Sequence, residues 1–173
     1  EALLSYTGDN AEYMNTSLRE GWEIPKGKVP SQREVDDSED GEFASETTIK
    51  LIDKALDRGG FDEDLVVYRG FSFTKSAKEL KGTTLYDLGF MSTSLDQEVA
   101  GGFTARKEET EHRILLKLTI RAGYPAASLG GYEKEVLLPR GTKVKLSEVI
   151  YPWKRGGEEI KEIQVLEGTV GDL

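Results

Sequence analysis

The chain has 173 residues, of which 37% are hydrophobic and 32% charged, with no cysteine, one histidine and a formal net charge of −9 at pH 7. This length fits one domain, and the composition excludes disulfides, thiolate zinc sites, cysteine nucleophiles and a membrane-spanning helix, because no apolar run approaches the ~18–20 residues of a span. The lone histidine, His112, argues against a His-rich metal site or a Ser-His-Asp triad, and the negative charge opposes nonspecific binding to nucleic acid or membranes.

The first part of the chain is predicted to be helical. Residues 2–19 carry spaced apolar side chains without proline, a pattern typical of one or two short helices with a turn at Thr7–Asn10. The start, Glu1–Leu4, lacks the basic region and the long apolar region of a signal peptide. We therefore expect residues 1–173 to form one domain, with no signal peptide in this sequence.

A polar connector is predicted at about residues 25–44. It contains two prolines and the acidic run Asp36–Asp40, which is typical of a solvated segment or of a surface that binds a basic partner. The next helix is predicted to begin at the N-cap Ser45 and to end at Gly59-Gly60. Its apolar residues fall near a helical period: Ile49, Leu51, Ile52, Ala55 and Leu56.

The rest of the chain predicts short strands separated by glycines. The candidates are residues 65–70, 88–94, 114–120, 135–139, 142–149 and 160–166. The segment 114–120 is almost continuously apolar, which predicts a strand that is buried on both faces. Helices in front and strands behind predict an α+β domain.

Two of these strands carry polar groups where apolar ones are expected. Arg69 closes an apolar strand before Gly70, and a guanidinium at this place either binds a phosphate or is solvated. Three consecutive hydroxyls, Ser92-Thr93-Ser94, follow another apolar stretch. They suit an edge strand, a ligand site or, for Ser94, the N-cap of a helix that starts near residues 95–96.

A third polar segment, Glu133-Lys134-Glu135, lies between a glycine turn and an apolar strand. In an extended chain the two carboxylates share one face, roughly 7 Å apart. Like charges this close are unfavourable unless a cation or hydrogen-bond donors lie between them. The segment is therefore either a functional pair of carboxylates or a charged entry into the strand.

Taken together and in this order, the three segments resemble the arginine-serine-glutamate class of mono-ADP-ribosyltransferases. The matching motifs are Tyr68-Arg69-Gly70, Gly89–Ser94 and Glu133–Pro139. Phe103–Arg106 is similar to the phosphate-nicotinamide loop of this family. Tyr6-Thr7-Gly8 with Asn15–Arg19 is similar to the helix that caps the NAD site in actin-modifying toxins, although Ala11 stands where the toxin pattern has a tyrosine.

The resemblance implies an ADP-ribosyltransferase-like fold, in which two packed, mainly antiparallel sheets form a cleft for NAD. Arg69 and Arg106 would hold the phosphates of NAD, Gly70 the nicotinamide carboxamide, and Phe103 would cover the nicotinamide ring. The resemblance assigns further cofactor-binding roles to Tyr6, Asn15, Ser92, Thr93, Ser94 and Glu135. No metal is expected, since no cluster of metal ligands is visible.

The resemblance also implies catalytic roles for Arg69, Ser92, Glu133 and Glu135. Ser92 would orient Glu135, and Glu135 would stabilise the oxocarbenium-like cation that forms as nicotinamide leaves. Glu133 would bind the acceptor arginine, because family members with glutamine there modify asparagine instead. Tyr132 would recognise the target protein or simply pack. His112 is predicted to be a surface residue.

These roles lead us to expect an NAD-dependent protein-arginine ADP-ribosyltransferase with side NAD glycohydrolase activity. Its partner would be a host protein with an exposed arginine, actin first among the candidates, and the chain would be secreted or injected into the host cytoplasm. No contact with nucleic acid or membrane is expected. A bacteriophage enzyme acting on host proteins and a non-catalytic binding module remain alternatives. A glycoside hydrolase fits poorly, because its carboxylates flank the scissile bond from opposite sides.

Overall fold

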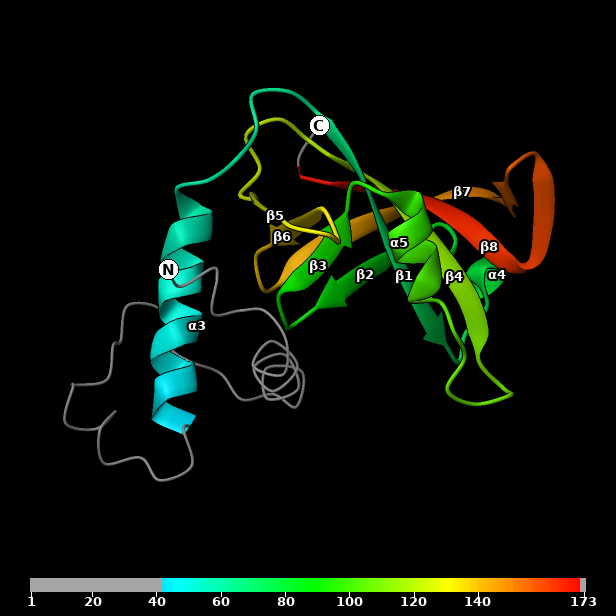
Figure 1. The fold of residues 1–173 in the computed structure, drawn as a ribbon, viewed down its shortest axis with the longest axis horizontal. Helices are drawn as coiled ribbons and strands as arrows, with labels where there is room; N and C mark the ends of the chain where they lie inside the picture. The colour runs from blue at the N-terminus through cyan, green and yellow to red at the C-terminus, as the bar shows by residue number, and fades with distance from the viewer. Residues whose placement is uncertain (1–41, 172–173) are drawn as a thin grey trace.

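The computed structural model of the chain describes residues 42–171 (Figure 1). Along the chain the elements are α3 (Glu42–Asp57), β1 (Leu65–Phe73), α4 (Ala77–Leu80), β2 (Thr84–Asp87), β3 (Met91–Ser94), α5 (Gln97–Gly102), β4 (His112–Ile120), β5 (Ala127–Gly130), β6 (Glu135–Leu138), β7 (Thr142–Arg155) and β8 (Glu158–Val170). The helices predicted within residues 2–19 and most of the acidic connector lie outside the described residues. No described helix combines the length and the apolar character that crossing a membrane requires.

The strands hydrogen-bond in the order β2-β7-β8-β4-β1-β3-β6-β5, and all pairs are antiparallel except β4 with β8. The α+β fold with mainly antiparallel strands is thus confirmed. The link between β1 and β3 is a single pair, Tyr68 with Ser94. All eight strands belong to one hydrogen-bonded sheet, where two packed sheets were expected. The narrow junction separates a larger part that ends at β1 from a smaller part, β3-β6-β5.

Strand β4 is buried on both faces, as predicted. Three consecutive residues, Ile114, Leu115 and Leu116, are almost fully buried. Ile114 and Leu116 belong to the main core, whereas Leu115 packs in a second cluster with Trp153. Since successive side chains of a strand point to opposite faces, the two clusters lie on opposite sides of the sheet. The strand that carries Arg69, β1, pairs with β4 over its whole length and is held rigidly by it.

Several predicted boundaries were wrong, since β4 starts at His112, β7 extends to Arg155 and β8 spans Glu158–Val170. The starts of α3 and β3 also differ. Helix α3 begins at Glu42 instead of being capped by Ser45, because the residues between Gly41 and Ser45 include no helix breaker. Residues 42–44, assigned to the connector, are therefore helical. The strand predicted at residues 88–94 begins only at Met91, because the backbone N–H of Gly89 donates to Asp87 Oδ1 at 2.9 Å and bends the chain first.

Helix α3 stands beside the β3-β6-β5 end of the sheet (Figure 1). Its buried face is formed by Ile49, Ile52 and Leu56, each 0% exposed, at the spacing of one helix face. A partly buried ion pair ties it to the turn after β6, since Arg140 Nη2 lies 2.8 Å from Asp53 Oδ2 and Arg140 Nε donates to both carboxylate oxygens at 3.0 Å.

This ion pair should contribute measurably to stability. Arg140→Ala leaves the half-buried Asp53 carboxylate without this partner, and we expect a loss of about 2 kcal/mol in the free energy of unfolding. The matched control is Arg121→Ala, which breaks the more exposed pair with Asp64 and should cost less than about 1 kcal/mol. Urea unfolding of both variants measures the difference. Equal losses would contradict an anchoring role for Arg140.

Candidate functional site

A cleft of about 410 Å³ opens where β1, β3 and α5 meet. The junction strands supply Arg69, Gly70 and the Ser92–Ser94 segment to its wall. Phe103, Ala105, Lys107 and Glu111 line it from the loop between α5 and β4, and Glu133 lines it from the turn before β6. The cleft thus collects side chains from all three segments that the sequence singled out.

Arg69 crosses the junction between the two parts of the sheet. Its Nη1 donates to the carbonyl oxygen of Ser92 at 2.8 Å, and its Nη2 lies 3.7 Å from Asp87 Oδ2. The side chain is 24% exposed. These contacts fix the guanidinium in the wall of the cleft, which Arg69 lines.

Gly70 is required for the packing of α5 on β1. A Cβ atom at this position would collide with the carbonyl oxygen of Ala100 in α5. Only glycine therefore lets the helix approach the strand this closely. Gly70 lies in the cleft wall.

Ser92 and Glu135 are joined directly, as predicted. Ser92 Oγ donates to Glu135 Oε1 at 2.9 Å across the β3–β6 pair. Burial raises the pKa of the Glu135 carboxyl above its ordinary value, the hydrogen bond from Ser92 lowers it, and the negative charge of Glu133 raises it. Burial has the largest effect, so the net change in pKa is upward. Glu135 is therefore a half-buried carboxyl whose pKa is raised mainly by burial and adjusted in opposite directions by Ser92 and Glu133.

The other two hydroxyls bind backbone groups of the neighbouring segment. Thr93 Oγ1 donates to the carbonyl oxygen of Val136 at 2.7 Å, and Ser94 Oγ donates to that of Glu133 at 2.6 Å. Ser94 Oγ also accepts from the N–H of Asp96 at 3.0 Å. Asp96, not Ser94, is the N-cap of α5, since its side chain accepts from Glu98 N.

The prediction of an extended Glu133-Lys134-Glu135 segment was wrong. Residues 131–134 form a turn, and Lys134 lies in the left-handed region with φ 46°, so strand β6 starts only at Glu135. The turn nonetheless brings Glu133 to the cleft. Tyr132 at its tip is 95% exposed, which removes the simple packing role as an alternative.

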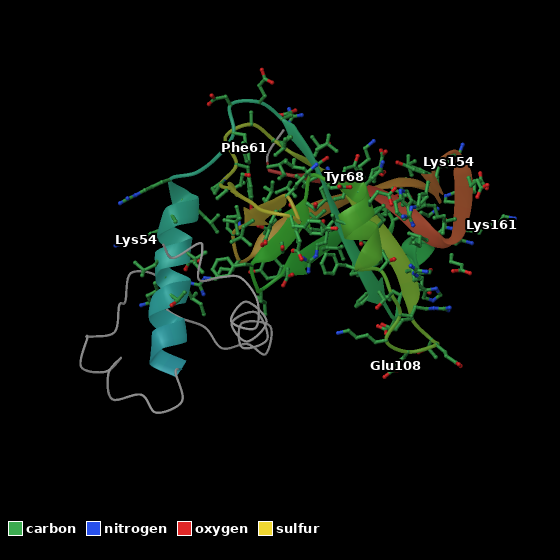
Figure 2. All side chains as sticks on the ribbon, in the orientation of Figure 1. Lys54, Phe61, Tyr68, Glu108, Lys154 and Lys161 are labelled. Atoms are coloured by element: carbon green, nitrogen blue, oxygen red, sulfur yellow. The ribbon has the colours of Figure 1, made fainter. Side chains whose placement is uncertain are left out.

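The loop between α5 and β4 covers one side of the cleft, and Glu108 lies at its tip (Figure 2). Phe103 lines the cleft while 58% exposed, leaving its ring free to cover a ligand. Arg106 is exposed between Ala105 and Lys107, which both line the cleft, but Arg106 itself does not. Its role toward a phosphate stays a prediction.

Sequence reasoning missed Lys107 and Glu111 in this loop. Lys107 lines the cleft and follows Arg106 in the sequence. Its positive charge next to Arg106 was the sequence feature that could have identified it. The Glu111 carboxylate accepts from the backbone N–H groups of Lys107 at 3.0 Å and Glu108 at 2.9 Å, and from Ser72 Oγ at 3.4 Å. No sequence pattern indicated this role, because it depends on how the loop folds back on β1.

The remaining predicted residues are placed as follows. Tyr6 and Asn15 lie outside the described residues. His112 is exposed at the start of β4, as predicted. Within residues 42–171, no three histidine, aspartate or glutamate side chains are grouped so that they could hold a metal ion.

Comparisons with known proteins agree with this geometry. The model of the family described as ADP-ribosyltransferase exoenzyme matches residues 1–164. Plx2a, an ADP-ribosyltransferase toxin from Paenibacillus larvae, is 26% identical with a TM-score of 0.68 over 99% of this chain and 84% of that one. A comparison with curated proteins gave no match.

Two more distant structures share the fold. C3larvin toxin, an ADP-ribosyltransferase from Paenibacillus larvae, is 23% identical with a TM-score of 0.60, covering 99% of this chain and 93% of that one. The Vis ADP-ribosyltransferase of Vibrio splendidus, solved in complex with agmatine, is 15% identical with a TM-score of 0.68, covering 99% and 73%. Because the family model spans nearly the whole chain and the cleft unites its three motifs, the chain belongs to the ADP-ribosyltransferase exoenzyme family.

Proposed function

We propose that the chain transfers ADP-ribose from NAD to an arginine side chain of a host protein and releases nicotinamide, with slow NAD hydrolysis as a side activity. The observation that carries the proposal is the hydrogen bond to the half-buried Glu135 from Ser92, which lines the cleft together with Arg69 and Glu133. In this proposal Glu135 serves bond cleavage, and the exposed Glu133 serves the acceptor.

The cleft suits NAD as the donor substrate. Its volume of about 410 Å³ falls within the roughly 300–1,000 Å³ of small-molecule sites. Two similar structures carry related ligands: exoenzyme S of Pseudomonas aeruginosa is bound to Carba-NAD, and the toxin BECa of C. perfringens is solved with NADH. In this chain Arg69 would bind a phosphate, with Arg106 as the second cation, Gly70 would bind the carboxamide, and Phe103 would cover the nicotinamide ring. Thr93 and Ser94 shape the adjoining wall.

Glu135 is proposed to act on the ribose next to the nicotinamide. It would accept a hydrogen bond from the 2′-hydroxyl and stabilise positive charge at the anomeric carbon as the bond to nicotinamide breaks. The charge appears only in the transition state, so the interaction lowers the barrier more than it strengthens substrate binding. Ser92 holds the carboxylate in the required orientation.

Glu133 is proposed to serve the acceptor. A carboxylate binds a guanidinium by two parallel hydrogen bonds and can accept the proton that is lost when the new bond forms. Agmatine, the compound bound to Vis, carries the same guanidinium group as an arginine side chain. Tyr132, highly exposed beside Glu133, would contact the surface of the target protein.

We place this activity in a toxin or effector that is secreted or injected into the host cytoplasm, with actin as the leading target. The relatives named as ADP-ribosyltransferase toxins support this setting. A bacteriophage enzyme acting on host proteins would use the same chemistry. We expect no contact with nucleic acid or membranes, because the net charge of −9 opposes both.

The direct test is incubation of the chain with NAD and agmatine, with and without a metal chelator. We expect nicotinamide and ADP-ribosyl-agmatine to appear at rates that the chelator leaves unchanged, because no metal takes part. Absence of nicotinamide release would instead favour a non-catalytic binding module.

Arg69→Ala should weaken the binding of NAD rather than slow the chemistry. Loss of one charge-assisted contact costs about 2–3 kcal/mol, so we expect the KM for NAD to rise about 30- to 150-fold with a smaller change in kcat. Steady-state kinetics of nicotinamide release measures both constants, and Arg121→Ala is the control for loss of a surface arginine. A large fall in kcat at unchanged KM would contradict this role.

The pH dependence should report the surroundings of Glu135. The carboxyl must be ionised to stabilise the cation, so kcat/KM for NAD should fall as the pH drops through its raised pKa. Ser92→Ala removes the contact that lowers this pKa and should move the acid limb to higher pH. Glu133→Gln removes the charge that raises it and should move the limb to lower pH. Shifts in the same direction would contradict the assignment.

A further inference from the structure

Ser94 lies at the point where the acceptor side of the cleft is joined to the catalytic strand. We propose that Ser94 is a positioning residue for Glu133 and thereby sets how much ADP-ribose goes to an acceptor arginine rather than to water. This inference rests on the proposed function and changes the role of Ser94 expected from the resemblance, in which it contacts NAD.

The hydroxyl of Ser94 is used within the protein. Its single proton is donated to the carbonyl oxygen of Glu133 at 2.6 Å, and its oxygen accepts from Asp96 N at 3.0 Å. The residue is 5% exposed. A serine hydroxyl has only one proton to donate, so donation to NAD would require that the bond to Glu133 break. Ser94 is thus better placed to hold the turn than to hold a ligand.

The turn that carries Glu133 needs such an anchor. Gly130 and Gly131 both have positive φ, 66° and 74°, and Lys134 follows at 46°. Glycines give a free turn many conformations of similar energy, so contacts from outside select the observed one. Two such contacts are the bond from Ser94 Oγ to Glu133 O and the bond from Leu95 N to Lys134 O at 3.1 Å.

The two serines of β3 therefore serve different carboxylates. Ser92 binds the side chain of Glu135, whereas Ser94 binds the backbone of Glu133. Removing the Ser94 hydroxyl leaves the Ser92–Glu135 bond and the β3–β6 pairing in place. It removes the bond that holds the backbone of Glu133, whose carboxylate is proposed to bind the acceptor. The expected consequence is a change in the fate of ADP-ribose that is larger than the change in NAD cleavage.

The test compares Ser94→Ala with Ser92→Ala in reactions that contain NAD and agmatine. The readout is the ratio of ADP-ribosyl-agmatine to free ADP-ribose, measured by chromatography. Loss of one buried hydrogen bond corresponds to about a tenfold effect, so we expect this ratio to fall about tenfold in Ser94→Ala. Ser94→Thr, which keeps the hydroxyl, should restore it. Ser92→Ala should lower both products together and leave the ratio within about twofold of the original.

An unchanged ratio in Ser94→Ala, or a parallel loss of both products, would overturn the proposal. If Ser94→Ala does not fold, Ser94→Cys takes its place, because a thiol is a weak donor and should give an intermediate ratio; a ratio equal to that of the original chain would again overturn it. Failure of the proposed function is recognised separately, since the unaltered chain would then form no ADP-ribosyl-agmatine. Free ADP-ribose as its only product would overturn both.

Discussion

Replacing Glu135 by glutamine should lower the turnover of NAD about a thousandfold while leaving the KM for NAD within about threefold. The amide keeps the size of the side chain and a hydrogen bond to Ser92, but it carries no negative charge. That charge stabilises a cation which exists only as the nicotinamide bond breaks, so the loss falls on kcat. Steady-state measurement of nicotinamide release gives both constants.

The control for this substitution is Glu159→Gln, which removes an exposed glutamate from β8, far along the chain from the cleft segments. Its kinetics should match those of the original chain. A Glu135→Gln variant with normal kcat and a strongly raised KM would mean that Glu135 binds NAD without acting on the bond, and it would contradict the mechanism.

Glu133→Gln should separate the two activities of the cleft. Transfer to agmatine should fall about a hundredfold or more, because the amide neither pairs with a guanidinium by charge nor accepts its proton. Release of nicotinamide should continue, since water reaches the same cation without a base at the rim. Parallel measurement of nicotinamide and of ADP-ribosyl-agmatine for each variant shows the separation.

Glu135→Gln is the comparison that tests this separation of nicotinamide release from transfer. Both products pass through one cation, so Glu135→Gln should remove both. If Glu133→Gln loses nicotinamide release as completely as Glu135→Gln does, both carboxylates serve cleavage. The preference for arginine would then need another source, such as the exposed Tyr132.

The strands that build the cleft were predictable because they are apolar and end at polar groups or glycines. Strand β1 begins at Leu65 and β6 at Glu135, as predicted, whereas β3 begins at Met91, inside the predicted range 88–94. Strands β2 and β5 were missed because each has only four residues and lies at an edge of the sheet. Their half-exposed sequences, Thr84–Asp87 and Ala127–Gly130, lack the apolar run that marks an interior strand.

The residues of the site could be predicted from the sequence, but their arrangement in space could not. The contact of Ser92 with Glu135 follows from pairing β3 with β6 and was anticipated. The left-handed backbone conformation of Lys134 was not anticipated, because it is uncommon for residues other than glycine and no sequence pattern marks it. The contribution of Glu111 depends on the path of an irregular loop, where side chains bind backbone groups that periodicity does not describe.

The central claim is that this cleft places ADP-ribose on arginine. Host-cell lysate can be incubated with the chain and NAD, and the modified residues identified by tandem mass spectrometry, with Glu135→Gln as the blank. The account predicts ADP-ribose on arginine side chains of a few proteins, actin among them, and none in the blank. Modification of asparagine or another residue in place of arginine, or NAD hydrolysis with no modified protein, would contradict it.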